Sequence, residues 1–496
     1  MELIKKKIGK YVPVISKEEI SEMSVEAIVP DSISDILKIS AALADVTISG
    51  KDVQTDRVLV KGMCRVSVVC TAENEGAGVV IPVSLPLSHV MAIQGCTSDS
   101  KAEIDIRIKE CTAHIINSRK ISVKAVVIIS VRIYNCVETE LTKGIEETEG
   151  VFCLEKPVCD EYISSIIEKQ VRIAESVSLD RGLVPLKCQS GVDIEDVKVI
   201  KGKAMIRGNC VLKVAFMCRE TGDIRTEKYH LPFSCVAEDD CLENGKKLET
   251  SAVTAQADIS VSESAGGSVL GCDICVILTI KCIEEIEEKI LCDVFSSVYE
   301  MKTEAVQISA NGKSGTDAQR KNISHVFESV TDAEKVCDFT DTIISTLTGE
   351  NVLDSSIYLC VVYKSREGEI ESVQLKHDVS YEIPGSFMDA EAVLENVSVE
   401  CTDGGNIKLE CEIVYLIRRG GTIPVSQITK CELLKDCPKK RSTAATLILR
   451  NVAKGESVWD IAKKYSTSPA AILEANKLEN EEAVTSGKLI MIPIVK

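Results

Sequence analysis

The chain has 496 residues, of which 45% are hydrophobic but only 4% aromatic, and its formal net charge at pH 7 is −18. A chain this long exceeds what one hydrophobic core organises and predicts several domains of about 100–200 residues each. The acidic balance argues against a nucleic-acid-binding protein, because such proteins neutralise phosphates with Lys and Arg. Since aromatics are scarce, the cores must be built from Val, Ile, Leu, Ala and Cys, a composition that favours strands.

The first 27 residues form an N-terminal segment with a cluster of three lysines but without the apolar run of a secretory signal. The longest apolar stretches, at 123–131 and 272–280, are shorter than the roughly 20 residues that a membrane-spanning helix needs. The sequence therefore predicts a cytoplasmic protein with no transmembrane segment. In that compartment the 22 cysteines are expected to be reduced, buried thiols rather than disulfides.

Short motifs recur at one fixed distance along the chain. The serines of LPLSHV and LPFSCV, Ser88 and Ser234, lie 146 residues apart, and the glycines of KGMC and RGNC, Gly62 and Gly208, keep the same offset. A weaker third copy places Ser380 another 146 residues further on. This period is too long for a solenoid unit, so each copy is predicted to be a domain. The predicted modules are residues 28–150, 165–300 and 323–432.

Inside a module the pattern is mostly that of strands. Residues 58–90 show alternating apolar positions, a polar turn containing Gly and a second alternating run, which predicts a hairpin. Residues 104–134 repeat this pattern. The fold class expected is therefore mainly β, with each module a β-sandwich or small barrel that has one buried face per strand.

The segments between modules have other patterns. Residues 158–177 carry apolar side chains at helix-like spacing, which predicts a connecting helix. The polar stretch 308–322 predicts a linker between the second and third modules. A basic linker at 433–445 precedes the C-terminal unit, residues 446–496.

No catalytic, metal-binding or cofactor-binding motif is visible. The five histidines occur at scattered positions, without the spacing of a metalloprotease or of a hydrolase motif. The one CxxC pair, Cys272 and Cys275, lies in a β-branched run, where residues three apart point to opposite faces of a strand. The sequence predicts a protein that is not an enzyme and needs no cofactor. An enzyme whose residues meet only on folding remains an alternative.

The C-terminal unit has the sharpest local signals. Ser457 followed by Asp460 is a capping-box pattern at the start of a helix, and Ser468 followed by Pro469 marks the start of a second helix. Apolar runs before and after these helices predict strands. The expected order is strand, helix, helix, strand.

Residues 451–478, NVAKGESVWDIAKKYSTSPAAILEANKL, and the closing SGKLIMIP resemble a LysM domain that covers about 446–494. The loop usually written Gly-Asp-Thr-Leu reads Gly-Glu-Ser-Val here. The resemblance implies a shallow groove that binds N-acetylglucosamine-containing glycans, formed in this chain by Gly455, Glu456, Ser457, Asn476, Lys477, Leu478 and Glu479. We expect Trp459 to fill the core of the unit, with stacking on a sugar as the alternative. If the groove binds protein instead, the neighbouring Lys463, Lys464 and Lys477 are expected to extend the contact.

The three modules, with their β-rich pattern and LPxS motifs, look like SPOCS domains, the spore-coat-assembly modules of endospore-forming bacteria. Repeated SPOCS-like modules followed by a terminal LysM domain match the layout of SipL-type morphogenetic proteins across almost the whole chain. The resemblance implies a protein of the mother-cell cytosol that collects at the forespore surface. It also implies binding to the coat morphogenetic ATPase, partly through the LysM domain. We therefore expect a non-catalytic scaffold in coat assembly, with a peptidoglycan-binding protein as the alternative.

Overall fold

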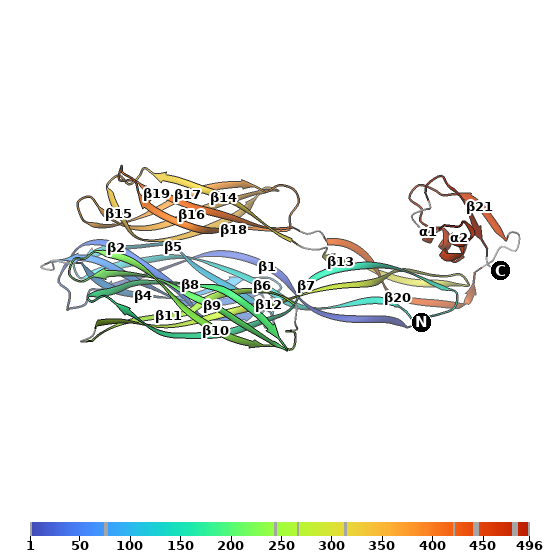
Figure 1. Cartoon of the computed structure of the whole chain (residues 1–496), viewed down its shortest axis with the longest axis horizontal. Coiled ribbons are helices and arrows are strands. Elements are labelled where there is room, and N and C mark those ends of the chain that lie inside the picture. The colour runs from blue at the N-terminus through green and yellow to red at the C-terminus, as the bar shows by residue number, and fades with distance from the viewer. Residues whose placement is uncertain are drawn as a thin grey trace.

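The computed structural model describes residues 2–73, 78–242, 246–264, 267–311, 315–419, 422–439, 446–478 and 485–494. Within these ranges the chain is mainly β, and its two helices both lie in the C-terminal unit. This confirms the predicted fold class. The elongated molecule has strand-rich modules at one end and the C-terminal unit at the other (Figure 1).

The first module is a sandwich of two three-stranded layers. One layer has the order β1-β6-β5 and the other the order β2-β3-β4. All neighbouring strands are antiparallel. The strands are β1 (Leu3–Ile28), β2 (Ile36–Gln54), β3 (Arg57–Ala72), β4 (Val79–Ala92), β5 (Lys101–Asn117) and β6 (Lys120–Ile145).

The second module repeats this topology with the layers β7-β12-β11 and β8-β9-β10. A short β1–β7 pairing, at Tyr11 and Ile163, joins its first layer to that of the first module in one six-stranded sheet. The strands are β7 (Val151–Leu179), β8 (Leu183–Ile200), β9 (Lys203–Cys218), β10 (Ile224–Glu238), β11 (Lys247–Ser264) and β12 (Gly267–Ser296).

The third module has the layers β14-β19-β18 and β15-β16-β17, with a two-stranded ribbon β13-β20 leading away from it. The strands are β13 (Tyr299–Asn311), β14 (Gly315–Phe327), β15 (Ala333–Thr348), β16 (Val352–Ser365), β17 (Ile370–Glu382), β18 (Asp389–Cys401), β19 (Ile407–Arg419) and β20 (Thr422–Pro438). Ser88, Ser234 and Ser380 lie in β4, β10 and β17, the same strand of each module.

The predicted connecting helix at 158–177 is wrong, because these residues belong to β7. This strand pairs with β12 along nearly its whole length, and its buried Val171 and Ile173 face the core of the second module. The β-branched side chains suit a strand, and pairing with a long partner outweighs the helix-like spacing.

Two predicted linkers and the N-terminal segment also lie in strands where the structure describes them. Residues 308–311 are the last residues of β13, and residues 315–322 are the first residues of β14. Strand β14 is an exposed edge strand, and its partner β19 supplies the buried side chains. Residues 433–438 belong to β20, and the N-terminal segment is most of β1. Residues 312–314 and 440–445 lie outside the described residues.

The repeated glycines coincide with a repeated irregularity of the sheets. Opposite Gly62 the register of β2 shifts between Ile48 and Gly50, and opposite Gly208 that of β8 shifts between Ile194 and Asp196. A Cβ at Gly62 would lie 2.5 Å from the carbonyl oxygen of Thr47, and a Cβ at Gly208 would lie 2.2 Å from that of Asp193. Each bulge thus brings a backbone too close for any side chain.

The third module lacks both the bulge and the glycine. Its equivalent position is Asp354 in β16, which pairs with Thr346 in a stretch without a register shift. The loss of glycine in the third copy therefore has a structural reason.

The outer halves of the long strands form a stalk beyond the sandwiches. Three ribbons, β1–β6, β7–β12 and β13–β20, extend in the same direction (Figure 1). Each ribbon contributes apolar side chains to one shared cluster, which includes Ile8, Leu141, Val158, Ile290, Ile308 and Val425. The stalk is therefore a packed three-ribbon bundle, built from one ribbon per module.

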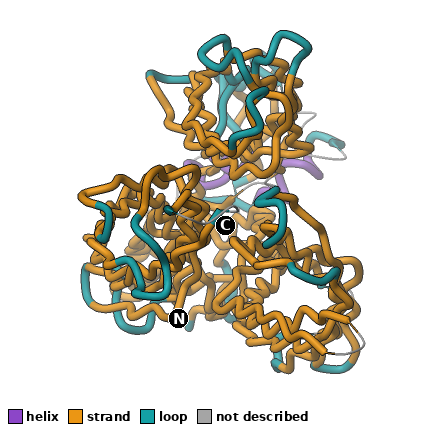
Figure 2. Tube along the Cα trace, turned by 90° about the vertical axis from the view of Figure 1, so that its left-hand side faces the viewer, coloured by secondary structure: helices purple, strands orange, loops and turns teal. Residues whose placement is uncertain are grey.

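The three sandwiches also contact one another. Seen end-on, three strand-rich lobes surround a common axis (Figure 2). Buried Leu43, Met217 and Val362, one from each module, share one apolar cluster. Lys187 of β8 and Asp338 of β15 form a buried ion pair between the second and third modules. The modules therefore pack together through both apolar and charged contacts.

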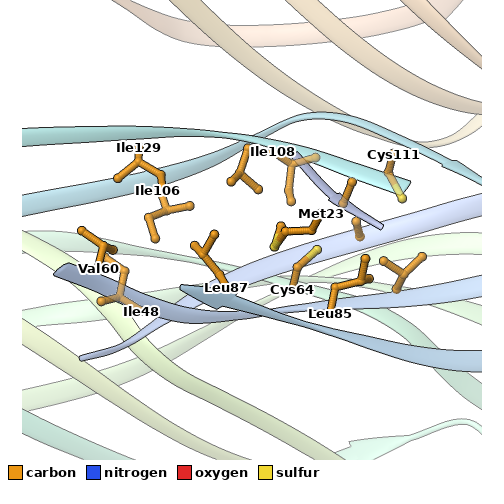
Figure 3. Packing of buried hydrophobic residues seen from close by; sticks show 14 of the residues in the cluster. Met23, Ile48, Val60, Cys64, Leu85, Leu87, Ile106, Ile108, Cys111 and Ile129 are labelled. Atoms are coloured by element: carbon orange, nitrogen blue, oxygen red, sulfur yellow. The ribbon is translucent and has the colours of Figure 1, made fainter. Parts of the chain in front are cut away.

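Aliphatic side chains and thiols fill the cores. In the first module Cys64 and Cys111 lie among Val, Ile, Leu and Met side chains (Figure 3). Burial raises the pKa of the Cys64 thiol to about 12, so this thiol stays protonated at neutral pH. Cys272 is buried and Cys275 is partly exposed.

No helix within the described ranges is long and apolar enough to cross a membrane.

Candidate functional site in the C-terminal unit

The C-terminal unit has the predicted order of elements. Strand β21 (Leu447–Asn451) pairs antiparallel with β22 (Leu489–Pro493), and the helices α1 (Val458–Tyr465) and α2 (Pro469–Ala475) lie between them in sequence. The helices and strands share a small core that includes the fully buried Ile461, Ala462, Ile472, Ile490 and Ile492.

A capping box starts α1, as the sequence predicts. The Ser457 Oγ accepts a hydrogen bond from the backbone N–H of Asp460 at 3.1 Å, and the Asp460 carboxylate accepts one from the backbone N–H of Ser457 at 3.0 Å. The hydrogen bonds from Ser457 hold the pKa of Asp460 below its usual value. The loop that enters α1 is thus fixed by polar groups of its own sequence.

The loop before α1 is closed by Glu456. Its carboxylate accepts hydrogen bonds from Arg450 Nη2 at 2.5 Å and from the backbone N–H of Ala453 at 3.1 Å. Gly455 has φ +79°, a left-handed conformation that favours glycine. Among the predicted groove residues, the Glu456 carboxylate stabilises the loop, and Gly455 and Ser457 are exposed.

The loop after α2 is held by Asn476. The Asn476 side-chain amide donates to the carbonyls of Ile472 at 2.7 Å and Met491 at 2.6 Å, and its oxygen accepts from the Met491 N–H at 2.7 Å. The two bonds to Met491 tie the end of α2 to β22, and the bond to Ile472 holds the side chain against its own helix. Lys477, with φ +52°, is exposed, Leu478 is partly buried, and Glu479 lies outside the described residues.

Both loops are anchored to the strand β22 and the residues leading into it. The backbone of Val452 bonds to Gly487 and Lys488, while Asn476 bonds to Met491. Anchors at 488 and 491 are about 10 Å apart along an extended chain. The two predicted loops are therefore neighbours, and the side chains of Glu456 and Asn476 are both engaged in hydrogen bonds within the domain.

Trp459 is buried, as the sequence predicts, with 5% of its surface exposed. However, it does more than fill the core of its own unit. Its ring packs edge-on against Phe295 of β12 at 4.9 Å between centroids, and Phe295 in turn packs against Phe152 of β7. Its Nε1 donates to the Asp293 carboxylate at 2.8 Å. Trp459 thus attaches the C-terminal unit to the tip of the β7–β12 ribbon.

Lys463 reinforces this attachment. One turn after Trp459 on α1, its Nζ lies 2.8 and 2.7 Å from the two carboxylate oxygens of Asp293. The sequence suggested Lys463 as part of a partner-binding edge, but it is already paired within the chain. Sequence reasoning missed Asp293 and Phe295, because nothing in their local pattern marks them as contacts of a unit more than 160 residues away.

A cavity of about 520 Å³ lies where the three sandwiches meet, and several of its charged groups pair with one another. Glu103 pairs with Lys281 at 2.7 Å, joining the first and second modules, and Arg132 pairs with Glu391 at 3.0 Å, joining the first and third. These ion pairs hold the modules together. Among the residues that the structure describes, no group of three His, Cys, Asp or Glu side chains is arranged to hold a metal ion.

Comparison with known families agrees with the geometry of the C-terminal unit. Residues 451–493 match the LysM domain family. No match to the chain was found among curated proteins or among solved structures. The β modules are thus described by their structure alone, and residues 451–493 form a LysM domain.

Proposed function

We propose that this protein is a non-catalytic scaffold of the endospore coat, in which three SPOCS-like modules carry a LysM domain that binds a protein partner. The partner implied by the resemblance to SipL-type proteins is the coat morphogenetic ATPase, in the mother-cell cytosol at the forespore surface. The order of the domains supports this proposal, with three related β modules followed by one LysM domain.

The observation that carries the proposal is the fixed attachment of the LysM domain to the stalk. Trp459 and Lys463 bind Asp293, and Phe295 packs into the core of the domain. A domain that only tethered the chain to a glycan would need no such docking. The attachment orients the LysM domain relative to the three modules, as a scaffold that positions several partners requires.

The groove loops favour a protein ligand over a sugar. The side chains of Glu456 and Asn476 are engaged inside the domain, which leaves few polar side chains to read sugar hydroxyls. The exposed Lys477, in the loop after α2, and the exposed Lys464, in the last turn of α1, add positive charge and suit an acidic partner.

The second candidate function is binding of peptidoglycan or another N-acetylglucosamine-containing glycan. The match of residues 451–493 to the LysM family favours it directly. The exposed backbone at Gly455 and Lys477 could hydrogen-bond an acetamide group.

Sedimentation with insoluble peptidoglycan separates the two candidates. The scaffold proposal expects the purified chain to stay in the supernatant and to bind the purified ATPase. The Lys477→Glu variant should weaken that binding, while the control Lys61→Glu, an equal charge change at an exposed site of β3, should not. Retention by peptidoglycan that N-acetylglucosamine oligomers compete away would favour the glycan candidate instead.

A further inference from the structure

The two-stranded sheet of the LysM domain has one covered and one open face. Its inner face carries Ile490 and Ile492, which are fully buried against the helices. On the outer face Leu447, Leu449 and Leu489 are 46%, 60% and 60% exposed. The register places Pro493 opposite Leu447 and Met491 opposite Leu449, while the polar Asn451 lies opposite Leu489 at one end of this otherwise apolar face. We call its five apolar residues the outer sheet face.

The outer sheet face lies away from the attachment to the stalk. The helices cover the inner face of the sheet, and the attachment residues Trp459 and Lys463 are on α1. With the long axis of the molecule horizontal, β21 lies at the end opposite the three sandwiches (Figure 1). A second molecule can therefore reach this face without displacing the LysM domain from the ribbon.

Charge indicates which molecule fits. Residues 446–494 contain six Lys and Arg and six Asp and Glu, so the LysM domain has no net charge, whereas the whole chain carries −18. Two copies that meet through their LysM domains keep their acidic modules at opposite ends, beyond the roughly 8 Å over which charges interact at physiological salt. Most other contacts between two copies would bring acidic surfaces together.

We propose that the outer sheet face is a self-association site, on which a second copy of this chain packs its own outer sheet face. The contact is isologous, so the leucines of β21 and β22 in one copy pack against those of the other about a two-fold axis. Sheets that pack face to face lie about 10 Å apart with interdigitated side chains.

The proposed contact is small. Five side chains per copy bury less than the roughly 1,200–2,000 Å² of a stable complex, so the dimer should be weak and form only at high local concentration. This role goes beyond the proposed binding of a partner by the groove loops, because the two surfaces use different residues.

Sedimentation equilibrium of the full chain tests the proposal, with a reductant present so that the exposed cysteines form no cross-links. The weight-average mass should rise with concentration from 53.9 kDa towards twice that value. The double variant Leu449→Glu, Leu489→Glu should remain at the monomer mass. The control Leu347→Glu changes a leucine of β15 that is 40% exposed and should associate as the unaltered chain does.

The fluorescence of Trp459 shows whether the double variant keeps the LysM domain folded and attached. If Leu449→Glu, Leu489→Glu unfolds it, the milder Leu449→Ser, Leu489→Ser replaces it in the same experiment. A mass that stays at 53.9 kDa throughout would overturn the proposal. So would association that persists unchanged in a folded double variant, since a different surface would then be responsible.

Discussion

The indole N–H of Trp459 donates a hydrogen bond of 2.8 Å to the carboxylate of Asp293, a residue 166 positions earlier in the chain. This contact joins the LysM domain to the longest ribbon of the stalk. Because Trp459 is the only tryptophan of the chain, its fluorescence reports on the attachment without labelling.

Removing the acceptor should release the LysM domain from the stalk. Asp293→Ala leaves the Trp459 N–H and the Lys463 ammonium without their partner, at a cost of about 1–3 kcal/mol to the attachment. The expected result is a red shift of the tryptophan emission while the circular dichroism of the β modules is retained. Asp273→Ala, on the same strand and paired with Arg172 at the surface, is the matched control. Equal emission spectra for Asp293→Ala and the unaltered chain would show that the contact does not hold the domain.

The capping box of α1 should contribute a large share of the stability of the LysM domain, because the domain is small. Ser457→Ala removes the acceptor for the Asp460 N–H and should destabilise the domain by about 1 kcal/mol. Thermal unfolding followed by Trp459 fluorescence measures the loss, with the exposed Ser486→Ala as control. An unchanged melting temperature in Ser457→Ala would mean that the cap contributes nothing.

The same capping box predicts that the stability of the LysM domain depends on pH. The pKa of Asp460 is lower in the folded protein than in the unfolded chain. The stabilisation by its carboxylate is therefore present above the unfolded pKa and is lost as the pH falls through the folded pKa. Between the unaltered chain and Asp460→Asn, the difference in melting temperature should therefore shrink in acid. A difference that stays constant from neutral to acidic pH would contradict this origin.

The Asp45 carboxylate, between the first two modules, should make stability depend on pH in the opposite direction to Asp460. Burial raises the pKa of Asp45 to about 6, while a hydrogen bond from the Cys188 N–H opposes this shift. A raised carboxyl pKa means that stability is greatest below the unfolded pKa and falls as the pH rises through about 6.

Asp45→Asn tests this second dependence. The variant should no longer lose free energy of unfolding between acidic and neutral pH. In the unaltered chain this loss is at most about 3 kcal/mol for a pKa shift of this size. Urea denaturation across that range measures it. Burial raises the pKa values of Asp105 and Asp341 too, so part of the dependence should remain in the variant. If the free energy of unfolding varied with pH in the same way for Asp45→Asn and the unaltered chain, Asp45 would not contribute to this pH dependence.

The repeated glycines should tolerate no side chain. In Gly62→Ala and Gly208→Ala the new Cβ would meet a backbone carbonyl oxygen at 2.5 and 2.2 Å, so the bulge must shift, at a cost of about 1–3 kcal/mol. Gly191→Ala, where nothing lies within 4 Å of the new Cβ, is the control. Chemical denaturation should show a lower free energy of unfolding for the first two variants only. Equal stability of Gly208→Ala and Gly191→Ala would contradict the role given to the bulge.

Much of the fold is predictable because local signals coincide with it. The 146-residue offset located equivalent strands in all three modules, and alternation in 58–90 predicted the hairpin of β3 and β4. The strand at 158–177 was missed, because its helix-like apolar spacing says nothing of the partner β12 that makes it a strand. Polar β14 was missed for a related reason, since its pairing with β19 depends on residues far away in sequence.

The candidate site was predictable only in its local part. The capping box and both helices follow from Ser457, Asp460, Ser468 and Pro469. That the Glu456 and Asn476 side chains would turn inward depends on Arg450 and Met491, which the loops meet only after folding. The attachment through Asp293 joins two separate units, and such a contact leaves no periodic pattern in either of them.

The most direct test of the scaffold proposal compares the full chain with one that ends before residue 446. Binding of each to the purified coat ATPase should be measured by titration, with tryptophan-independent detection because the shorter chain lacks Trp459. The proposal predicts that the full chain binds and that the shorter chain, with its β modules still folded by circular dichroism, binds at least tenfold more weakly, a loss of about 1.4 kcal/mol or more. Equal affinity of the two chains would contradict a role for the LysM domain in binding this partner.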